Sequence, residues 1–442
     1  MRRLILAVTL AVAALAAAAA AAAAPIGPPV TDPNGIINLP AGYSYTLLAD
    51  SCSDSVRSTE SGLTFPMPDD FDANFAFNAP GGETWLLSGH ELTEPRPGDF
   101  QGDAGKCAVD EQATVDDGDS DGTGSISRLL LGRDGTTVLD RQLITTGLHD
   151  LCAGAVTPWN TILVNEEFPF IVDPERRSGW VWEIDPATGA QTKLTGMGRF
   201  SHEQEAYANG AWYLTDDRGD ARFLYKFVPD RHSDLTTGSL YGLAFSKATM
   251  TGTWIGPLNP NDPDTDMRSR GYQPATWGFV KHEGIVASAS STGTGGNELT
   301  MSESSAGADP GRIWTFQDRG GVVYGSILVE GDWARLSRPD NLRYTDAGDL
   351  LLMEDHSSGD FRANPATGGI NQIWLLPRNR SGSENMLLFA NLPGGAEPTG
   401  PWFSNDNRLL YLSIQDQPRA GAGTSRLIAI HAPGSFNQPY DR

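Results

Sequence analysis

Residues 160–167 read NTILVNEE, an apolar run that ends in two carboxylates. The same arrangement recurs along the chain, at 83–91 (ETWLLSGHE), 211–217 (AWYLTDD), 349–355 (DLLLMED) and 408–416 (RLLYLSIQD). Short apolar runs bounded by turn-forming residues are typical of buried strands. The chain therefore repeats a strand that ends in an acid.

A second strand follows each of these runs, often with a hairpin turn such as RDGT at 133–136. Residues 285–290 (IVASAS) supply a run in the remaining gap, without a terminal acid, which makes six units. A unit of three or four strands cannot cover both of its faces alone, so the units must stack or close radially. We expect an all-β fold, a six-bladed β-propeller with long inter-strand insertions, in which residues 43–48 (YSYTLL) complete the last blade. A large sandwich or jelly roll is the alternative, but it leaves the recurring acids unexplained.

Two segments, 92–123 and 229–276, interrupt the repeat and are interpreted as insertions. The first contains Asp117, Asp119 and Asp121, which match the opening of a calcium-binding loop. Arg128 stands where such a loop requires a bidentate glutamate. We therefore expect a solvated loop with at most weak calcium binding.

The first 24 residues have the pattern of a secretory signal. Arg2 and Arg3 precede an unbroken apolar run at 4–24 whose second half is nearly all alanine. This pattern predicts a signal peptide at 1–24 and a single β-propeller domain at 25–442. A membrane anchor is the alternative, but alanine anchors weakly, so no stable membrane anchor is expected after cleavage. The predicted location is periplasmic or extracellular, with the Sec and Tat routes both open.

The formal net charge of −23 argues against nucleic acid and anionic membrane surfaces as partners. Acidity of this size suits a protein that binds hard cations, and it also suits solubility in a saline medium. We expect a monomer that acts on a small molecule.

The chain has three cysteines, Cys52, Cys107 and Cys152. In an oxidising compartment two of them would normally pair. Cys52 and Cys107 lie in polar, loop-like sequence, so we expect a disulfide between them. Cys152 is then the odd thiol, and on spacing alone the simplest explanation is a buried, inert side chain.

The acids at the strand ends are the candidate functional groups. The innermost strand of each propeller blade lines the central channel, so side chains at the ends of those strands should converge. The candidates are Glu91, Glu166, Glu167, Asp216, Asp217, Glu354, Asp355 and Asp416. Neighbours along a strand point to opposite faces, so one member of each doublet should reach the channel. Converging carboxylates repel one another unless cations neutralise them, and this many oxygen ligands favour Ca2+.

Four stretches of the chain resemble the motifs of a known family. They are 151–167 (LCAGAVTPWNTILVNEE), 198–217 (GRFSHEQEAYANGAWYLTDD), 337–355 (SRPDNLRYTDAGDLLLMED) and 399–406 (TGPWFSND). In this order they resemble the PhoX-type alkaline phosphatases. The resemblance implies a six-bladed propeller that hydrolyses phosphate esters outside the cytoplasm with a cluster of Ca2+ and Fe3+ ions.

Position by position, the resemblance implies roles for particular residues. Cys152 looks like the thiolate ligand of iron, which would account for the odd thiol. Glu203 and Asp340 look like carboxylate ligands of the catalytic cluster, and Arg338 looks like the arginine that grips the phosphate. The predicted metal set is completed by the acidic pairs Glu166, Glu167, Asp216, Asp217, Glu354 and Asp355.

The chain departs from the family pattern at Ala155 and Asn160, where glycines are usual, and at Asp340, where a longer glutamate is common. These departures leave two alternatives open. One is a calcium-only hydrolase resembling lactonases, with central ligands from 339–341 (PDN). The other is a non-catalytic binding propeller that calcium holds together.

Overall fold

The computed structural model describes residues 26–92, 106–107, 122–169, 177–288, 298–305, 307–356, 370–392, 396–416, 425–437 and 440. The predicted signal peptide and the loop at 117–121 lie outside the described residues. Strands dominate, and the α-helices are α1 (Pro263–Ser269) and α2 (Pro274–Trp277). In the part of the chain that is described, no helix is long and apolar enough to cross a bilayer.

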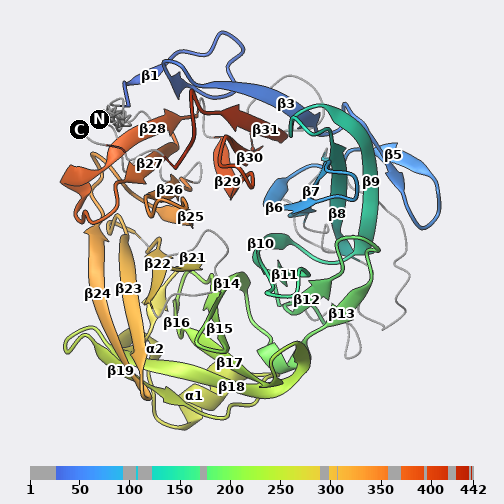
Figure 1. The fold of residues 1–442 in the computed structure, drawn as a ribbon. Coiled ribbons are helices and arrows are strands. Elements are labelled where there is room, and N and C mark those ends of the chain that lie inside the picture. Colours follow the sequence, from blue (N-terminus) through green and yellow to red (C-terminus); the bar gives the residue numbers. More distant parts are fainter. Residues whose placement is uncertain are drawn as a thin grey trace, which may run out of the picture.

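The strands form a ring of sheets around a central axis (Figure 1). Two of the sheets hold four antiparallel strands in chain order, and we call them blades two and five. Blade two consists of β10 (Leu151–Val156), β11 (Ile162–Glu166), β12 (Val181–Ile184) and β13 (Gln191–Lys193). Blade five consists of β25 (Pro339–Tyr344), β26 (Leu350–Glu354), β27 (Gln372–Leu376) and β28 (Leu387–Asn391).

Blades three and four share a nine-stranded sheet, joined where β19 pairs with β24. Blade three consists of β14 (His202–Ala208), β15 (Ala211–Asp216), β17 (Tyr225–Arg231) and β18 (Asp234–Ser246), extended by β19 (Thr251–Ile255). Blade four consists of β21 (His282–Ala287), β22 (Glu298–Glu303), β23 (Arg312–Arg319) and β24 (Val322–Glu330). The interpretation of 229–276 as an insertion was therefore wrong in part, because β18 and β19 continue the sheet of blade three before α1 and α2 begin.

Blade one is the inner part of a six-stranded sheet. It consists of β6 (Phe71–Asn78), β7 (Thr84–His90), β8 (Gly122–Leu131) and β9 (Val138–Gly147), with β4 (Ser55–Ser58) and β5 (Thr64–Pro66) added at its outer edge. Short pairs outside the blades are β1 (Pro29–Val30) with β2 (Leu39–Pro40), and β16 (Ala221–Arg222) with β20 (Phe279–Val280). Two short 3₁₀ turns cover Thr195–Met197 and Ser383–Asn385.

Blade six joins the two ends of the described chain. It consists of β29 (Glu397–Phe403), β30 (Leu409–Gln415), β31 (Arg426–His431) and β3 (Ser44–Asp50). Strand β3 pairs antiparallel with β31, so an early segment completes the last sheet, as the sequence predicted for residues 43–48. Six four-stranded units are thus present among the described residues, and the fold is an all-β propeller.

The first strand of each blade faces the axis and contacts the first strand of the next. The sequence of these contacts is β6, β10, β14, β21, β25 and β29, and it returns to β6. The acid-ended runs that indicated the repeat form the second strands, β7, β11, β15, β26 and β30, so their assignment as innermost strands was wrong. Neighbouring blades cover both faces of these second strands, and β11, β15, β26 and β30 are buried along their whole length. That burial explains why they are continuously apolar rather than alternating.

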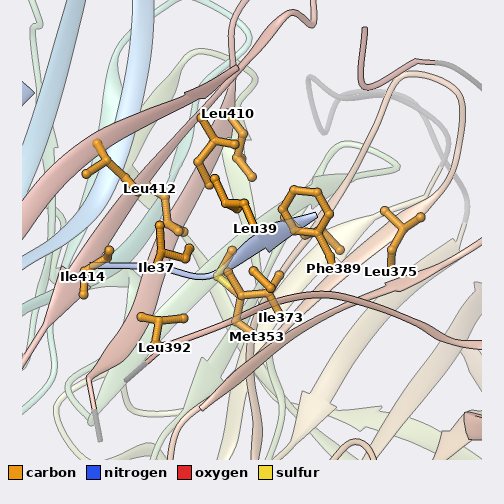
Figure 2. Packing of buried hydrophobic residues seen from close by; sticks show 14 of the residues in the cluster. Ile37, Leu39, Met353, Ile373, Leu375, Phe389, Leu392, Leu410, Leu412 and Ile414 are labelled. Carbon is orange, nitrogen blue, oxygen red and sulfur yellow. The ribbon is translucent and has the colours of Figure 1, made fainter. Parts of the chain in front are cut away.

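Apolar side chains fill the space between adjacent blades. Figure 2 shows Ile37 and Leu39, from the segment before β3, packed with Met353 of blade five and Leu410 and Leu412 of blade six. The early segment therefore contributes to the core between two blades as well as to the sheet of blade six.

A disulfide joins Cys52, which follows β3, to Cys107, with 5.5 Å between their Cα atoms. Cys152 is the free cysteine of the described residues and is buried in β10. The predicted pairing is confirmed.

Replacing Leu48 of β3 with alanine is expected to weaken the closure of the ring. Leu48 is 1% exposed and packs in the cluster that contains Leu427 of β31, whereas its neighbour Leu47 is 42% exposed. Leu48→Ala should lower the free energy of unfolding by about 2–5 kcal/mol, measured by urea denaturation. Leu47→Ala is the matched control and should change it by less than about 0.5 kcal/mol. Equal losses in the two variants would contradict this account of the closure.

Candidate metal centre

A cavity of about 340 Å³ opens at one end of the central axis, and acidic side chains dominate its wall. Eleven carboxylates line it: Asp70, Asp72, Glu91, Glu167, Glu203, Asp217, Glu283, Asp340, Asp355, Glu397 and Asp416. Cys152, Gln415, Phe168 and the two lysines Lys106 and Lys281 complete the lining. Every blade contributes at least one carboxylate, so the ring does gather sequence-distant acids at one place.

Irregular pairing at the start of the inner strands delivers one set of acids. In blades one, three, four and five the register shifts directly after the first residue pair. The residues in these shifts include Asp72, Glu203, Glu283 and Asp340. A bulge re-aims the side chain that it displaces, so the same local device directs four acids to the cavity. In blade two the shift follows Cys152 instead.

The acidic doublets deliver a second set. Glu167, Asp217 and Asp355, the second members of their doublets, line the cavity, while the first members do not. Glu166 accepts hydrogen bonds from the backbone amides of His149, Gly179 and Trp180. Since neighbours along a strand point apart, one acid of each pair faces the axis and the other faces the next strand.

The other two first members are also held away from the cavity. Glu354 accepts from the backbone amides of Ser337 and Gln372 at 2.7 and 3.1 Å. Asp216 lies 4.0 Å from the guanidinium of Arg222. Glu166, Asp216 and Glu354, which the sequence included in the metal set, are therefore placed behind the cavity wall, where they hold the second strands to their surroundings.

Two groups of three donors lie close enough to share an ion. Ligand atoms of Asp72, Glu91 and Cys152 lie within 4.8 Å of one another, and those of Glu203, Glu283 and Asp340 do the same. The Cys152 thiol donates to Glu167 at 3.2 Å. The first group combines a sulfur with carboxylates, and the second is made of oxygen donors alone.

Uncharged side chains hold the carboxylates of the first group in place. Gln415 donates to Glu91 at 3.0 Å and to Asp72 at 3.4 Å, and Thr399 donates to the other oxygen of Asp72 at 2.9 Å. These bonds leave further lone pairs on both carboxylates, since each oxygen can accept two hydrogen bonds or bind an ion.

Crowding and burial disfavour the ionised form of these acids. Burial raises the pKa of Glu203 well above its ordinary value, and the nearby Asp340 carboxylate raises it further. Burial, with Asp355 beside it, raises the pKa of Asp340 to about 7. Burial and then Glu167 raise the pKa of the Cys152 thiol. The cavity therefore requires either protons or cations.

Two lysines supply positive charge at the cavity. Lys281 lies 3.1 Å from Glu283 and 3.6 Å from Asp217, and Lys106 pairs with Asp70 and lies 3.6 Å from Asp416. Glu283 first, and Asp217 second, hold the pKa of Lys281 well above its ordinary value. Two ammonium groups are far too few to neutralise eleven carboxylates.

Backbone groups hold the side chain of Arg338, which does not line the cavity. Its guanidinium donates to the backbone carbonyls of Ser304, Asp309 and Gly307 and lies over the ring of Trp333. It is 4% exposed and does not line the cavity. These contacts make Arg338 a brace between blades four and five, and the phosphate-gripping role that the family resemblance implied for it stays a prediction.

The sequence analysis missed Asp70, Asp72, Glu283, Glu397 and both lysines. A signal for Glu283 was present, because His282–Glu283 at the start of β21 repeats His202–Glu203 at the start of β14. Both histidines are buried and bond backbone groups, His202 at the Gly198 carbonyl and His282 at the Phe223 carbonyl. Asp72 and Glu397 lack such a dipeptide, and only the alignment of the inner strands reveals them.

The donor set fits a resident metal cluster. Carboxylate oxygens suit hard cations such as Ca2+, and a thiolate suits a transition metal. The carboxyls are buried, crowded and short of basic partners, as expected where cations compensate charge. Glu91, Glu167, Glu203, Asp217, Asp340 and Asp355 are the acids predicted from the sequence that meet here, together with Cys152 and Asp416.

The ring of sheets defines a β-propeller. Its cavity, lined by carboxylates and a thiol, has the donor groups of a metal-binding site. The chain belongs to the family described as alkaline phosphatase PhoX, whose sequence profile matches residues 136–418. It is therefore a phosphoric ester hydrolase by family. No match was found among curated proteins.

Solved structures agree on the fold. PhoX of Pseudomonas fluorescens in complex with vanadate, a transition state analogue, superimposes with a TM-score of 0.69 at 18% identity, covering 94% of this chain and 99% of that one. A gluconolactonase of Xanthomonas campestris gives a TM-score of 0.42 at 13% identity, covering 92% and 98%. The first likeness supports the propeller fold, and the second is too weak to bear on function.

Without bound cations, the protein is expected to be less stable at about pH 8 than at about pH 5. The pKa of Asp340 is about 7 in the folded state against 3.8 ordinarily, so the unfolded chain ionises first and stability falls as the pH rises between these values. Thermal melting in EDTA at the two pH values measures the loss.

The control variant is Asp340→Asn, which cannot ionise and should show a smaller loss between the same two pH values. Added Ca2+ should restore the melting temperature of the unsubstituted protein at the higher pH. An equal loss in the asparagine variant would show that net charge, rather than the crowded cavity, causes the pH dependence.

Proposed function

We propose that this phosphatase hydrolyses phosphate monoesters or diesters of small molecules at the axial cavity, with Ca2+ and Fe3+ held by its carboxylates and by Cys152. The observation that carries the proposal is the meeting of eleven carboxylates and one buried thiol in a single cavity. The calcium-only alternatives leave the position of this thiol, within 4.8 Å of Asp72 and Glu91, without a purpose.

The two groups of donors suit different metal ions. Cys152, with Asp72 and Glu91, offers the mixed sulfur and oxygen set that favours iron. Glu203, Glu283 and Asp340 offer oxygen alone, which favours calcium. Glu167, Asp217 and Asp355 stand beside both groups and provide further oxygens.

Bound cations supply charge compensation for the phosphoryl oxygens and lower the pKa of water toward neutrality. The chain's own residues fix the geometry in which this happens. Gln415 and Thr399 orient Asp72 and Glu91, and Asn341 donates to Asp340 at 3.0 Å. The Asn341 side-chain oxygen accepts from the backbone amide of Gly400 at 2.8 Å and lies 3.0 Å from the Thr399 hydroxyl, which links blade five to blade six behind the ligands.

The metal and activity assignments can be tested together on the purified protein. Glu203→Gln should lower kcat/KM for p-nitrophenyl phosphate or its bis ester by more than about 100-fold, since loss of a group that only supports a ligand already costs about 10–100-fold. Cys152→Ser should lose iron and keep calcium, measured by elemental analysis. A serine variant that keeps its iron would contradict the ligand assignment, and calcium with no iron and no turnover in the unsubstituted protein would favour the binding propeller.

Glu205→Gln is the matched control for Glu203→Gln. Glu205 is buried on the same strand, β14, but it accepts a hydrogen bond from Asn165 at 2.9 Å and does not line the cavity. A glutamine can accept the same bond, so this variant should keep most of its activity. Equal losses in the two variants would point to a defect of β14 rather than to the cavity.

We also propose that residues 1–24 direct export of the protein and are then removed. The signal-like sequence and the Cys52–Cys107 disulfide support this, because disulfides persist in oxidising compartments. Mass spectrometry of the protein from the periplasm or the medium should find a chain that begins near residue 25. A full-length chain recovered from the cytoplasm with free Cys52 and Cys107 would contradict export.

A further inference from the structure

Equivalent positions in the blades can be recognised from one recurring backbone hydrogen bond. The residue just after the second strand donates its amide to the carbonyl of a residue just before the inner strand, at 2.8–3.0 Å. The pairs are Glu91 to Asp70, Glu167 to Asp150, Asp217 to Ser201, Ser304 to Lys281 and Asp355 to Arg338. The bond aligns five blades residue by residue.

This alignment sets blade four apart. In blades one, two, three and five the donor is an acid that lines the cavity, and in blade four it is Ser304, which does not. Blade four therefore lacks one carboxylate. The accepting residue of the same blade is Lys281, whose side chain lines the cavity.

The side chain of Lys281 bridges two blades. Its backbone is left-handed, with φ of 47°. From there the ammonium lies 3.1 Å from Glu283 of blade four and 3.6 Å from Asp217 of blade three. Arg338, at the equivalent position of blade five, is also left-handed, but its side chain goes to backbone carbonyls instead. The left-handed backbone alone therefore does not direct a side chain into the cavity. Lys281 enters it because its ammonium pairs there with Asp217 and Glu283.

We propose that Lys281 is a resident cation of the cavity, which takes the place of one divalent ion between Asp217 and Glu283. Blade four then supplies a fixed positive charge where four other blades supply a ligand. This inference rests on the proposed metal centre. It adds that the sequence of the chain, as well as the supply of metal ions in the medium, sets how many ions the cavity holds.

The test is the number of Ca2+ ions bound per chain, by equilibrium dialysis with elemental analysis. Lys281→Met should bind one more Ca2+ than the unsubstituted protein, because Asp217 and Glu283 become available to an ion. Lys281→Arg keeps the charge and should bind the unchanged number. If Lys281→Met binds the same number as the unsubstituted protein, the inference is overturned while the metal centre stands. If the unsubstituted protein binds no Ca2+, the proposed calcium centre fails first.

Lys247→Met is the matched control. Lys247, in the turn between β18 and β19, pairs with Glu303 of blade four at 2.6 Å but does not line the cavity, so the variant loses the same charge elsewhere. Its Ca2+ number should not change, and an increase there would overturn the inference by showing an effect of net charge.

Instability of Lys281→Met would itself be informative. An uncompensated pair of buried acids should lower its melting temperature in EDTA, and millimolar Ca2+ should restore that temperature to the value of the unsubstituted protein. Failure of Ca2+ to restore it would contradict the substitution of a cation by the ammonium.

Discussion

Mutual repulsion among buried carboxylates is the constraint on which the rest of this structure depends. Eleven carboxylates, ten of them buried or half-buried, share one cavity, and the first two strands of the blades hold most of them there. Such a cavity is tolerable only when positive charge enters it. The same repulsion favours the binding of cations, so the cost to the fold and the proposed capacity for metal chemistry have one origin.

The doublets show how one sequence feature serves both stability and binding. In Glu166–Glu167 the first acid ties backbone amides of neighbouring segments and the second faces the cavity. Glu354–Asp355 repeats the division. The first acid anchors the end of the second strand, and that anchoring sets where the second acid points.

Part of this architecture could be predicted from the sequence. Repeated apolar runs with terminal acids indicated a closed ring, because strands buried on both faces must be covered by neighbours. Periodicity could not tell which strand of a blade lies innermost, since β14 is partly polar and register shifts interrupt both β10 and β14. Acids that reach the cavity through a bulge, such as Asp72 and Glu283, stand second in inner strands that the sequence did not identify, so they were missed. A motif fixes the backbone position of Arg338 and not the direction of its side chain, so its hydrogen bonds to backbone carbonyls could not be predicted from the sequence.

The pairing of β3 with β31 has a consequence for how the molecule is made. Nearly the whole chain separates these two strands, so the ring stays open until the last strand has emerged from the ribosome. Until then both outer sheet edges are exposed and can pair with other chains. This is also the most non-local strand pairing among the described residues, so loop closure over several hundred residues is expected to be a late and slow event in folding.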